Sequence, residues 1–131
     1  MALTKNHPLG ETVLHSTASS VATGVAGYVR APFRGRIIQA GTMIGGATTT
    51  ADATVTVSIA GTAVTGGSFV ITQSGSAAGD HDYAATNDAS ANSTITAANI
   101  CNENDAIKFA LTGSGTGGGH VYCYAVIQKL A

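Results

Sequence analysis

Charged side chains are scarce in this sequence of 131 residues. Lys, Arg, Asp and Glu together make up 10% of the chain, against about 25% in an average globular protein. The formal net charge is −1, and no basic stretch is present that could cover the phosphate backbone of a nucleic acid. The composition therefore argues against a nucleic-acid partner.

Long apolar runs and an export signal are also missing. No segment approaches the roughly 20 apolar residues that a membrane-spanning helix needs. Residues 1–8 lack the basic region and apolar core that are typical of a secretory signal peptide. We therefore expect no membrane partner.

Cysteine is present only as Cys101 and Cys123. Because no export signal is visible, two free thiols are the favoured interpretation, although a disulfide could form if two strand ends meet. Cys123 alternates with apolar residues and is expected to be buried and inert. Cys101 lies in a polar segment and is the better candidate for a reactive thiol.

No compact catalytic or metal-binding motif is present. The glycines of residues 113–118 match the spacing of a dinucleotide-binding loop, but a strand rather than a helix is expected to follow them. Residues 80–82, Asp-His-Asp, contain metal-ligand types, although chance grouping of loop residues is the more common reason for such a motif. The four histidines are widely separated in the sequence. We therefore expect no enzyme activity and no cofactor.

Alternating apolar and polar residues are abundant. In residues 54–59, Val55, Val57 and Ile59 share one face and the polar residues share the other, as in a strand with one buried face. Gly41 is expected to mark a bulge. The expected strands are residues 21–31, 36–44, 54–59, 62–64, 68–73, 93–97, 106–112 and 120–128. This pattern predicts an all-β fold, an antiparallel β-sandwich or jelly roll of about eight strands.

Two segments fall outside this pattern. Residues 1–20 are predicted to be an extended N-terminal arm with a short strand near residues 11–17, and residues 21–131 the sandwich domain. Residues 74–92 are rich in Gly, Ser, Ala, Asp and Asn and predict a long loop, with a weak helix candidate at residues 84–91.

Two groups of side chains are candidates for an interface. Three arginines flank a Pro-Phe turn, and Arg is enriched at the centres of protein interfaces; a solvated turn is the alternative. Two tyrosines of the last strand could be interface aromatics or could pack on the sheet. The candidate interface residues are Arg30, Phe33, Arg34, Arg36, Tyr122 and Tyr124.

Three segments together resemble a known family. They are residues 28–38 (YVRAPFRGRII), 51–64 (ADATVTVSIAGTAV) and 67–80 (GSFVITQSGSAAGD). The sequence is similar in these segments to small structural proteins of tailed bacteriophages, in particular head decoration (cement) proteins. The N-terminal arm and the two cysteines match no pattern of that family.

The resemblance implies a function. Proteins of this family are β-sandwiches or jelly rolls that commonly sit as homotrimers on the capsid surface and reinforce the shell. It implies the major capsid protein as partner, the virion as location after synthesis in the host cytoplasm, and no catalytic residues. The alternative hypothesis is a tail or fibre module that binds a host receptor, against which the absence of Trp counts mildly.

Overall fold

The computed structural model describes residues 10–130, and this part of the chain is built from strands without any helix. It therefore contains no helix that could cross a membrane. The long strands are β1 (Glu11–Ala18), β2 (Ala26–Arg30), β3 (Gly35–Ile44), β5 (Ala53–Ile59), β6 (Thr62–Ile71), β7 (His81–Ala85), β10 (Ala106–Thr112) and β12 (Val121–Lys129). The two-residue strands are β4 (Thr48–Thr49), β8 (Ser93–Thr94), β9 (Ile100–Cys101) and β11 (Thr116–Gly117). The predicted all-β sandwich of about eight strands is confirmed.

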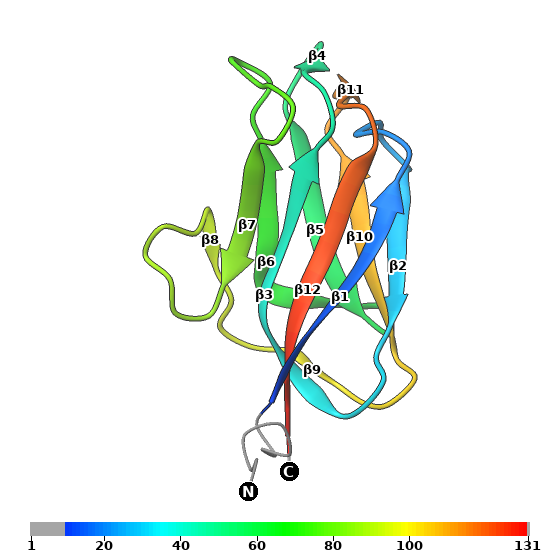
Figure 1. Ribbon diagram of the computed structural model, residues 1–131, viewed down its shortest axis with the longest axis vertical. Helices are drawn as coiled ribbons and strands as arrows, with labels where there is room; N and C mark the ends of the chain where they lie inside the picture. The colour runs from blue at the N-terminus through cyan, green and yellow to red at the C-terminus, as the bar shows by residue number, and fades with distance from the viewer. Residues whose placement is uncertain (1–9, 131) are drawn as a thin grey trace, which may run out of the picture.

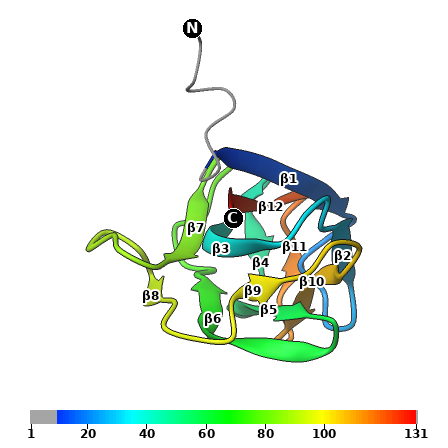
Figure 2. The ribbon, with the colours of Figure 1, turned by 90° about the horizontal axis from the view of Figure 1, so that it is seen from below.

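The strands form two packed sheets (Figures 1 and 2), apart from β4 and β11, which pair only with each other. The larger sheet has the order β1-β12-β3-β7-β8, with β9 also paired to β3, and the smaller has the order β2-β10-β5-β6. The pairs β1/β12, β2/β10, β3/β7 and β5/β6 join the first half of the chain to the second half in reverse order. A chain folded back at the β5–β6 turn and then rolled up gives this order, which is that of a jelly roll.

The core lies between the two sheets and follows from the alternation in the sequence. In β5, Val55, Val57 and Ile59 are buried. Phe69 and Ile71 of β6 also face inward, as their alternation predicts. Removing such side chains from water is the main favourable term in folding, about 1.5–3 kcal/mol for each large apolar side chain.

Strand β12 is central in the larger sheet, as its two apolar faces predict. Its inward face, with Val121, Cys123, Ala125 and Ile127, is fully buried. Its flanks are covered by β1 and β3. The pairing of β12 with β3 shifts register between Val126, which pairs with Gln39, and Ile127, which pairs with Ile37. The bulge therefore does not lie at the predicted position, Gly41, which pairs regularly with Tyr124.

The arm predicted over residues 1–20 needs correction for its second half. Residues 1–9 lie outside the described residues. Residues 11–18 are β1, and every one of them pairs with a residue of β12. The sandwich therefore begins at residue 11 rather than 21, because the hydrogen-bonding groups along that edge of β12 are satisfied by this chain's own strand.

The long loop predicted over residues 74–92 contains a strand, and the helix candidate at residues 84–91 is wrong. Strand β7 pairs with β3 from Gln39↔Ala85 to Met43↔His81. Ala84 and Ala85 are buried by this pairing. The remaining parts, residues 74–80 and 86–92, are loops as predicted, and the second projects beside β8 (Figure 1).

Candidate functional site

A row of aromatic and histidine side chains crosses the outer face of the larger sheet. Neighbouring rings lie at centroid distances that suit favourable ring pairing. The pairs are His15–Tyr122 at 5.4 Å, Tyr122–Tyr124 at 6.0 Å, Tyr124–His81 at 5.5 Å and His81–Tyr83 at 4.7 Å. We call this set the aromatic row. It links β1, β12 and β7 across β3.

The register of the sheet brings these residues together. Tyr124 pairs with His15 on one side and with Gly41 on the other. Gly41 in turn pairs with Tyr83. These residues therefore point to the same face, which is the outer one because Cys123 and Ala125 point into the core.

Tyr124 is the fixed centre of the aromatic row. Its side chain is 8% exposed, and Gln39 Nε2 donates a hydrogen bond of 2.6 Å to its hydroxyl oxygen. His81 Nε2 is also hydrogen-bonded to this hydroxyl. Burial raises the pKa of Tyr124, so the phenol stays neutral at physiological pH and the network holds the ring in one position.

Tyr83 ties the row to the projecting loop. Its hydroxyl donates a hydrogen bond of 2.7 Å to Asp88 Oδ2, and Asp88 Oδ1 accepts one of 2.8 Å from the Ser90 N–H. The hydrogen bond with Asp88 raises the pKa of Tyr83, and the same bond lowers the pKa of Asp88. The loop therefore sets its one carboxylate, which stays ionised, against the Tyr83 end of the row.

Partly exposed apolar side chains lie in the aromatic row and beside it. Tyr122 is 37% exposed, Met43 of β3 is 41% exposed and Val13 of β1 is 53% exposed. Their register positions put them on the outer face with the row. Together they form a surface without Lys, Arg, Asp or Glu that we call the aromatic face. Its residues are Val13, His15, Met43, His81, Tyr83, Tyr122 and Tyr124.

Asp82 does not contribute to this face. It alternates with His81 and Tyr83 and pairs with the buried Thr42. Burial raises the pKa of Asp82, and Asp80 nearby raises it further. Within the described residues, no group of three or more His, Cys, Asp or Glu side chains could hold a metal ion.

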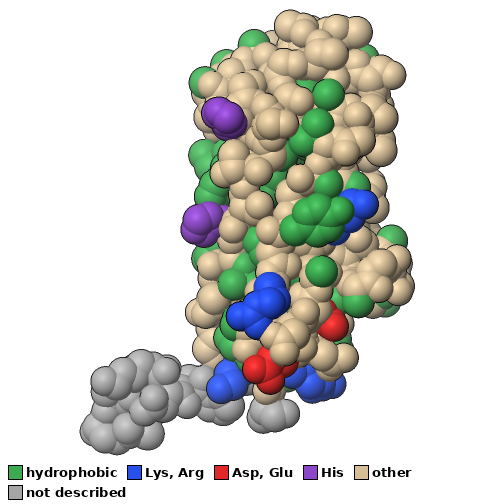
Figure 3. Space-filling view, turned by 90° about the vertical axis from the view of Figure 1, so that its right-hand side faces the viewer, with side chains coloured by type: hydrophobic (Ala, Val, Ile, Leu, Met, Phe, Trp, Pro, Cys, Tyr) green, Lys and Arg blue, Asp and Glu red, His purple; other side chains and the backbone are tan. Residues whose placement is uncertain are grey.

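The arginine candidates lie elsewhere, at the end of β2, at the start of β3 and in the turn between them. Figure 3 shows Lys and Arg side chains gathered toward one end of the sandwich. Arg30 Nη1 donates a hydrogen bond to Asn104 Oδ1, while Arg34 and Arg36 are exposed. Phe33 is half-buried, with Lys129 Nζ 5.8 Å from its ring centroid. The six predicted interface residues therefore divide between a basic end and the aromatic face.

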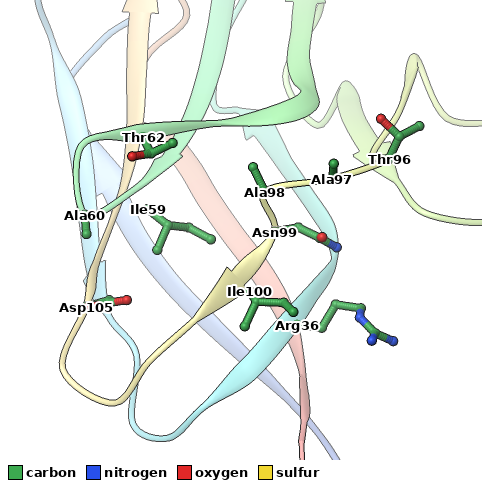
Figure 4. A pocket seen from close by; sticks show the side chains of 10 residues that line it. All are labelled: Arg36, Ile59, Ala60, Thr62, Thr96, Ala97, Ala98, Asn99, Ile100 and Asp105. Atoms are coloured by element: carbon green, nitrogen blue, oxygen red, sulfur yellow. The ribbon is translucent and has the colours of Figure 1, made fainter.

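A cavity of about 570 Å³ opens at the basic end. It lies between the β5–β6 turn and residues 96–100, with Arg36 and Asp105 on opposite sides (Figure 4). Two of its polar groups are engaged within the chain: Asn99 donates to the Ile37 carbonyl and Asp105 accepts from the Asn102 N–H.

The cysteines are free and both are buried. Cys101 pairs with Gly35 and Cys123 with Thr42 along the same strand, β3. Those partners are about 23 Å apart at about 3.3 Å per residue, whereas disulfide-bonded Cα atoms lie about 4–7 Å apart. The possible disulfide is therefore wrong. Cys101, the better candidate for a reactive thiol in the sequence, is buried, and burial raises its pKa.

Sequence reasoning found two members of the aromatic face and missed the others. Tyr122 and Tyr124 stood out because they alternate in a strong strand. His81 and Tyr83 belong to a strand that was taken for a loop. His15 lies in the short strand that the alternation of Val13 and His15 predicted near residues 11–17, which was assigned to the arm and not to the sandwich.

Comparison with known proteins concerns the fold. No family model matches the sequence, and no curated protein matches it. The catalytic domain of a GH87 alpha-1,3-glucanase in complex with tetrasaccharides is similar with a TM-score of 0.52 and 8% identity, over 94% of this chain and 28% of that chain. At this identity the similarity shows a shared β fold alone.

Two smaller solved chains match less well. The carbohydrate-binding module CBM36, in complex with calcium and xylotriose, gives a TM-score of 0.44 and 19% identity over 95% of this chain and 93% of that chain. The cyanophage Pam1 capsid asymmetric unit gives a TM-score of 0.46 and 16% identity over 94% of this chain and 87% of that chain.

Proposed function

We propose that this chain is a structural virion protein of a tailed bacteriophage, a decoration protein that binds the outer surface of the assembled head. In that role it stabilises the lattice of the major capsid protein. The resemblance of residues 28–38, 51–64 and 67–80 to head decoration proteins supports the choice of partner. The single observation that carries the proposal is the aromatic face, whose seven residues include no Lys, Arg, Asp or Glu and are held on a rigid sheet.

The aromatic face has the composition of a protein-binding surface. Interface centres are enriched in Tyr and Met and depleted in charged residues. Tyr122 and Met43 are adjacent across β12 and β3, and both are partly exposed. The fixed Tyr124 ring beside them reduces the side-chain freedom that binding would otherwise remove.

Reinforcing a shell requires binding and no chemistry. A protein that binds only the assembled lattice stabilises it by mass action. The family resemblance predicts a homotrimer, which would present three aromatic faces at once and gain affinity from multivalency. Under this proposal the protein is not an enzyme, and it has no cofactor.

The exposed arginines of the basic end give a second, weaker contact. Arg34 and Arg36 are exposed beside the half-buried Phe33. Contacts between such exposed charges are screened by salt. We therefore expect the arginine contribution to head binding to fall with ionic strength and the contribution of the aromatic face to persist.

Binding to heads that lack this protein tests the proposal. Purified protein is added to expanded heads of the cognate phage, and bound protein and the temperature of head disruption are measured. We expect saturable binding and a higher disruption temperature. Tyr122→Ala should weaken binding about 10-fold or more, the cost of losing an interface anchor of about 1.4 kcal/mol.

Tyr28→Ala is the matched control. Tyr28 is 58% exposed on β2 of the smaller sheet, where Lys108 Nζ lies 5.8 Å from its ring centroid. Its removal should leave head binding unchanged. An absence of binding to heads would contradict the proposal, and binding to host cells instead would favour a tail or fibre module.

A further inference from the structure

Strand β1 is an open edge of the larger sheet. It pairs with β12 along its whole length, and no described residue pairs with its other side. Figure 2 shows it as the outermost strand on one side of the sandwich. A strand edge of this kind presents unpaired N–H and C=O groups that another strand can bind.

The pairing with β12 defines which backbone groups face outward. Lys129 N–H donates a hydrogen bond of 2.9 Å to the Gly10 carbonyl. Because bonded positions alternate in an antiparallel pair, the even-numbered residues Thr12, Leu14, Ser16 and Ala18 bond to β12. The backbone groups of Glu11, Val13, His15 and Thr17 therefore face away from it.

This edge lacks the devices that usually prevent strand pairing, which are proline, lysine, a bulge or a short length. β1 has eight residues, and its register with β12 has no shift. Its one charge, Glu11, is at its end. The other edges are protected: β2 is shorter and ends at Arg30, β8 has two residues, and β6 has a register shift and a bridge from Thr65 to Ala97.

We propose that β1 pairs antiparallel with β1 of a second copy of this chain, about a two-fold axis at Leu14. In this register Glu11 faces Thr17 of the other copy and Val13 faces His15. Every outward N–H then meets an outward C=O, since residues 11, 13, 15 and 17 all pair with members of the same set. No like charges are opposed, so the edge is complementary to itself.

The contact joins the two larger sheets into one continuous sheet. Val13, which is 53% exposed in the single chain, lies against His15 of the other copy, and the two aromatic faces become neighbours. Because a two-fold contact adds copies in pairs, the protein in solution is a dimer, or a dimer of trimers if the predicted trimer contact also forms. This inference does not depend on the proposed virion function.

Disulfide trapping tests the register. Leu14→Cys places two thiols opposite each other at a non-hydrogen-bonded pair, with Cα atoms about 4.5 Å apart, and should form a covalent dimer in air. Val13→Cys and His15→Cys should each remain unlinked alone and form a covalent dimer when mixed. The native cysteines are buried and do not compete.

A proline variant tests the contact without a new thiol. Val13→Pro removes an outward N–H and leaves the bonds to β12 intact, which is the position where edge strands tolerate proline. In sedimentation velocity the wild type should sediment with twice the mass of this variant. Thr12→Pro is the control that breaks the ladder to β12, and it should lower the melting temperature instead.

The outcomes are exclusive. The two-fold contact is supported if the wild type has the mass of a dimer or a hexamer and the cysteine variants form the expected disulfides. A monomer or simple trimer, or disulfide formation in another register, overturns it. If circular dichroism shows Val13→Pro to be unfolded, the disulfide pattern of the exposed positions 13 and 15 alone decides.

Discussion

Gly41 of β3 lies directly opposite Tyr124 of β12, and a Cβ atom at position 41 would come within 2.8 Å of the Tyr124 hydroxyl oxygen. On its other side Gly41 is opposite Tyr83, whose Cβ would be 2.6 Å away. The Tyr124 side chain therefore passes over β3 and reaches His81 of β7 because position 41 has no side chain. Glycine weakens a strand interior, and here that cost is offset by the packing of the aromatic row.

Gly41→Ala should therefore lower stability and disturb the row. Overpacking of this kind costs about 1–3 kcal/mol, so we expect the free energy of unfolding in urea to fall by that amount. Gly46→Ala is the control, because its Cβ would have no neighbour nearer than 3.6 Å. Equal stability of the two variants would contradict the role given to Gly41.

Two buried threonines differ in their hydrogen bonding. Thr42 is 1% exposed and its Oγ1 has no partner among the described residues. Thr48 is as deeply buried, but its Oγ1 lies 3.1 Å from Ser76 Oγ. A buried hydroxyl without a partner costs free energy, whereas a satisfied one contributes about 1 kcal/mol.

The same substitution should thus have opposite effects at the two sites. Thr42→Val should raise the free energy of unfolding by about 1 kcal/mol, and Thr48→Val should lower it by a similar amount. Thermal and urea unfolding of both variants measure this. A loss of stability in Thr42→Val would mean that its hydroxyl is satisfied.

Local alternation predicted most of the fold. Residues such as Val55 and Val57 alternate with polar neighbours, and this fixes both the strand and its buried face. Strand β7 escaped prediction because its first residues, His81 and Asp82, are polar and typical of a loop. Its strand conformation comes from pairing with β3, some 40 residues earlier in the chain, which a local pattern does not contain.

The candidate site was predictable only in part for the same reason. Tyr122 and Tyr124 lie in one strand and were found together. Their contacts with His15 and His81 depend on the order of strands in the sheet. The role of Gly41 depends on its neighbours on both sides, so the sequence alone suggested a bulge instead.

The hydrogen bond between Tyr83 and Asp88 predicts a pH dependence. The pKa of Tyr83 is raised from its ordinary value of 10.0, so its contribution to stability is full below that pH and is lost as the pH rises through the folded-state pKa. The pKa of Asp88 is lowered, so its contribution is present above 3.8 and is lost as the pH falls through the folded-state pKa. The contact is therefore complete at neutral pH.

Asp88→Asn should lower the pKa of Tyr83 toward 10.0, because the carboxylate that favours the neutral phenol is gone. Alkaline titration followed by tyrosinate absorbance measures this. The absorbance change that is missing in Tyr83→Phe identifies the ionisation of Tyr83. Tyr124 should still titrate late in that variant, because burial raises its pKa. An Asp88→Asn titration identical to that of the wild type would contradict the contact.

Both thiols should be unreactive in the folded protein. Burial raises the pKa of Cys123 to about 11 and also raises that of Cys101, and the thiolate is the reactive form. Burial of the neutral thiols contributes fully to stability below the pKa of the thiols in the unfolded chain. This contribution is lost as the pH rises through their pKa values in the folded protein. At neutral pH, alkylation should therefore proceed only as fast as the protein opens.

Mass spectrometry after timed alkylation tests this expectation. The native protein should remain unlabelled under conditions in which the urea-unfolded protein gains two labels per chain, one for each cysteine. Gly41→Ala should be labelled faster than Gly46→Ala, because a less stable fold opens more often. Rapid single labelling of the native wild type would show an accessible thiol and contradict the buried position of Cys101 beside Gly35.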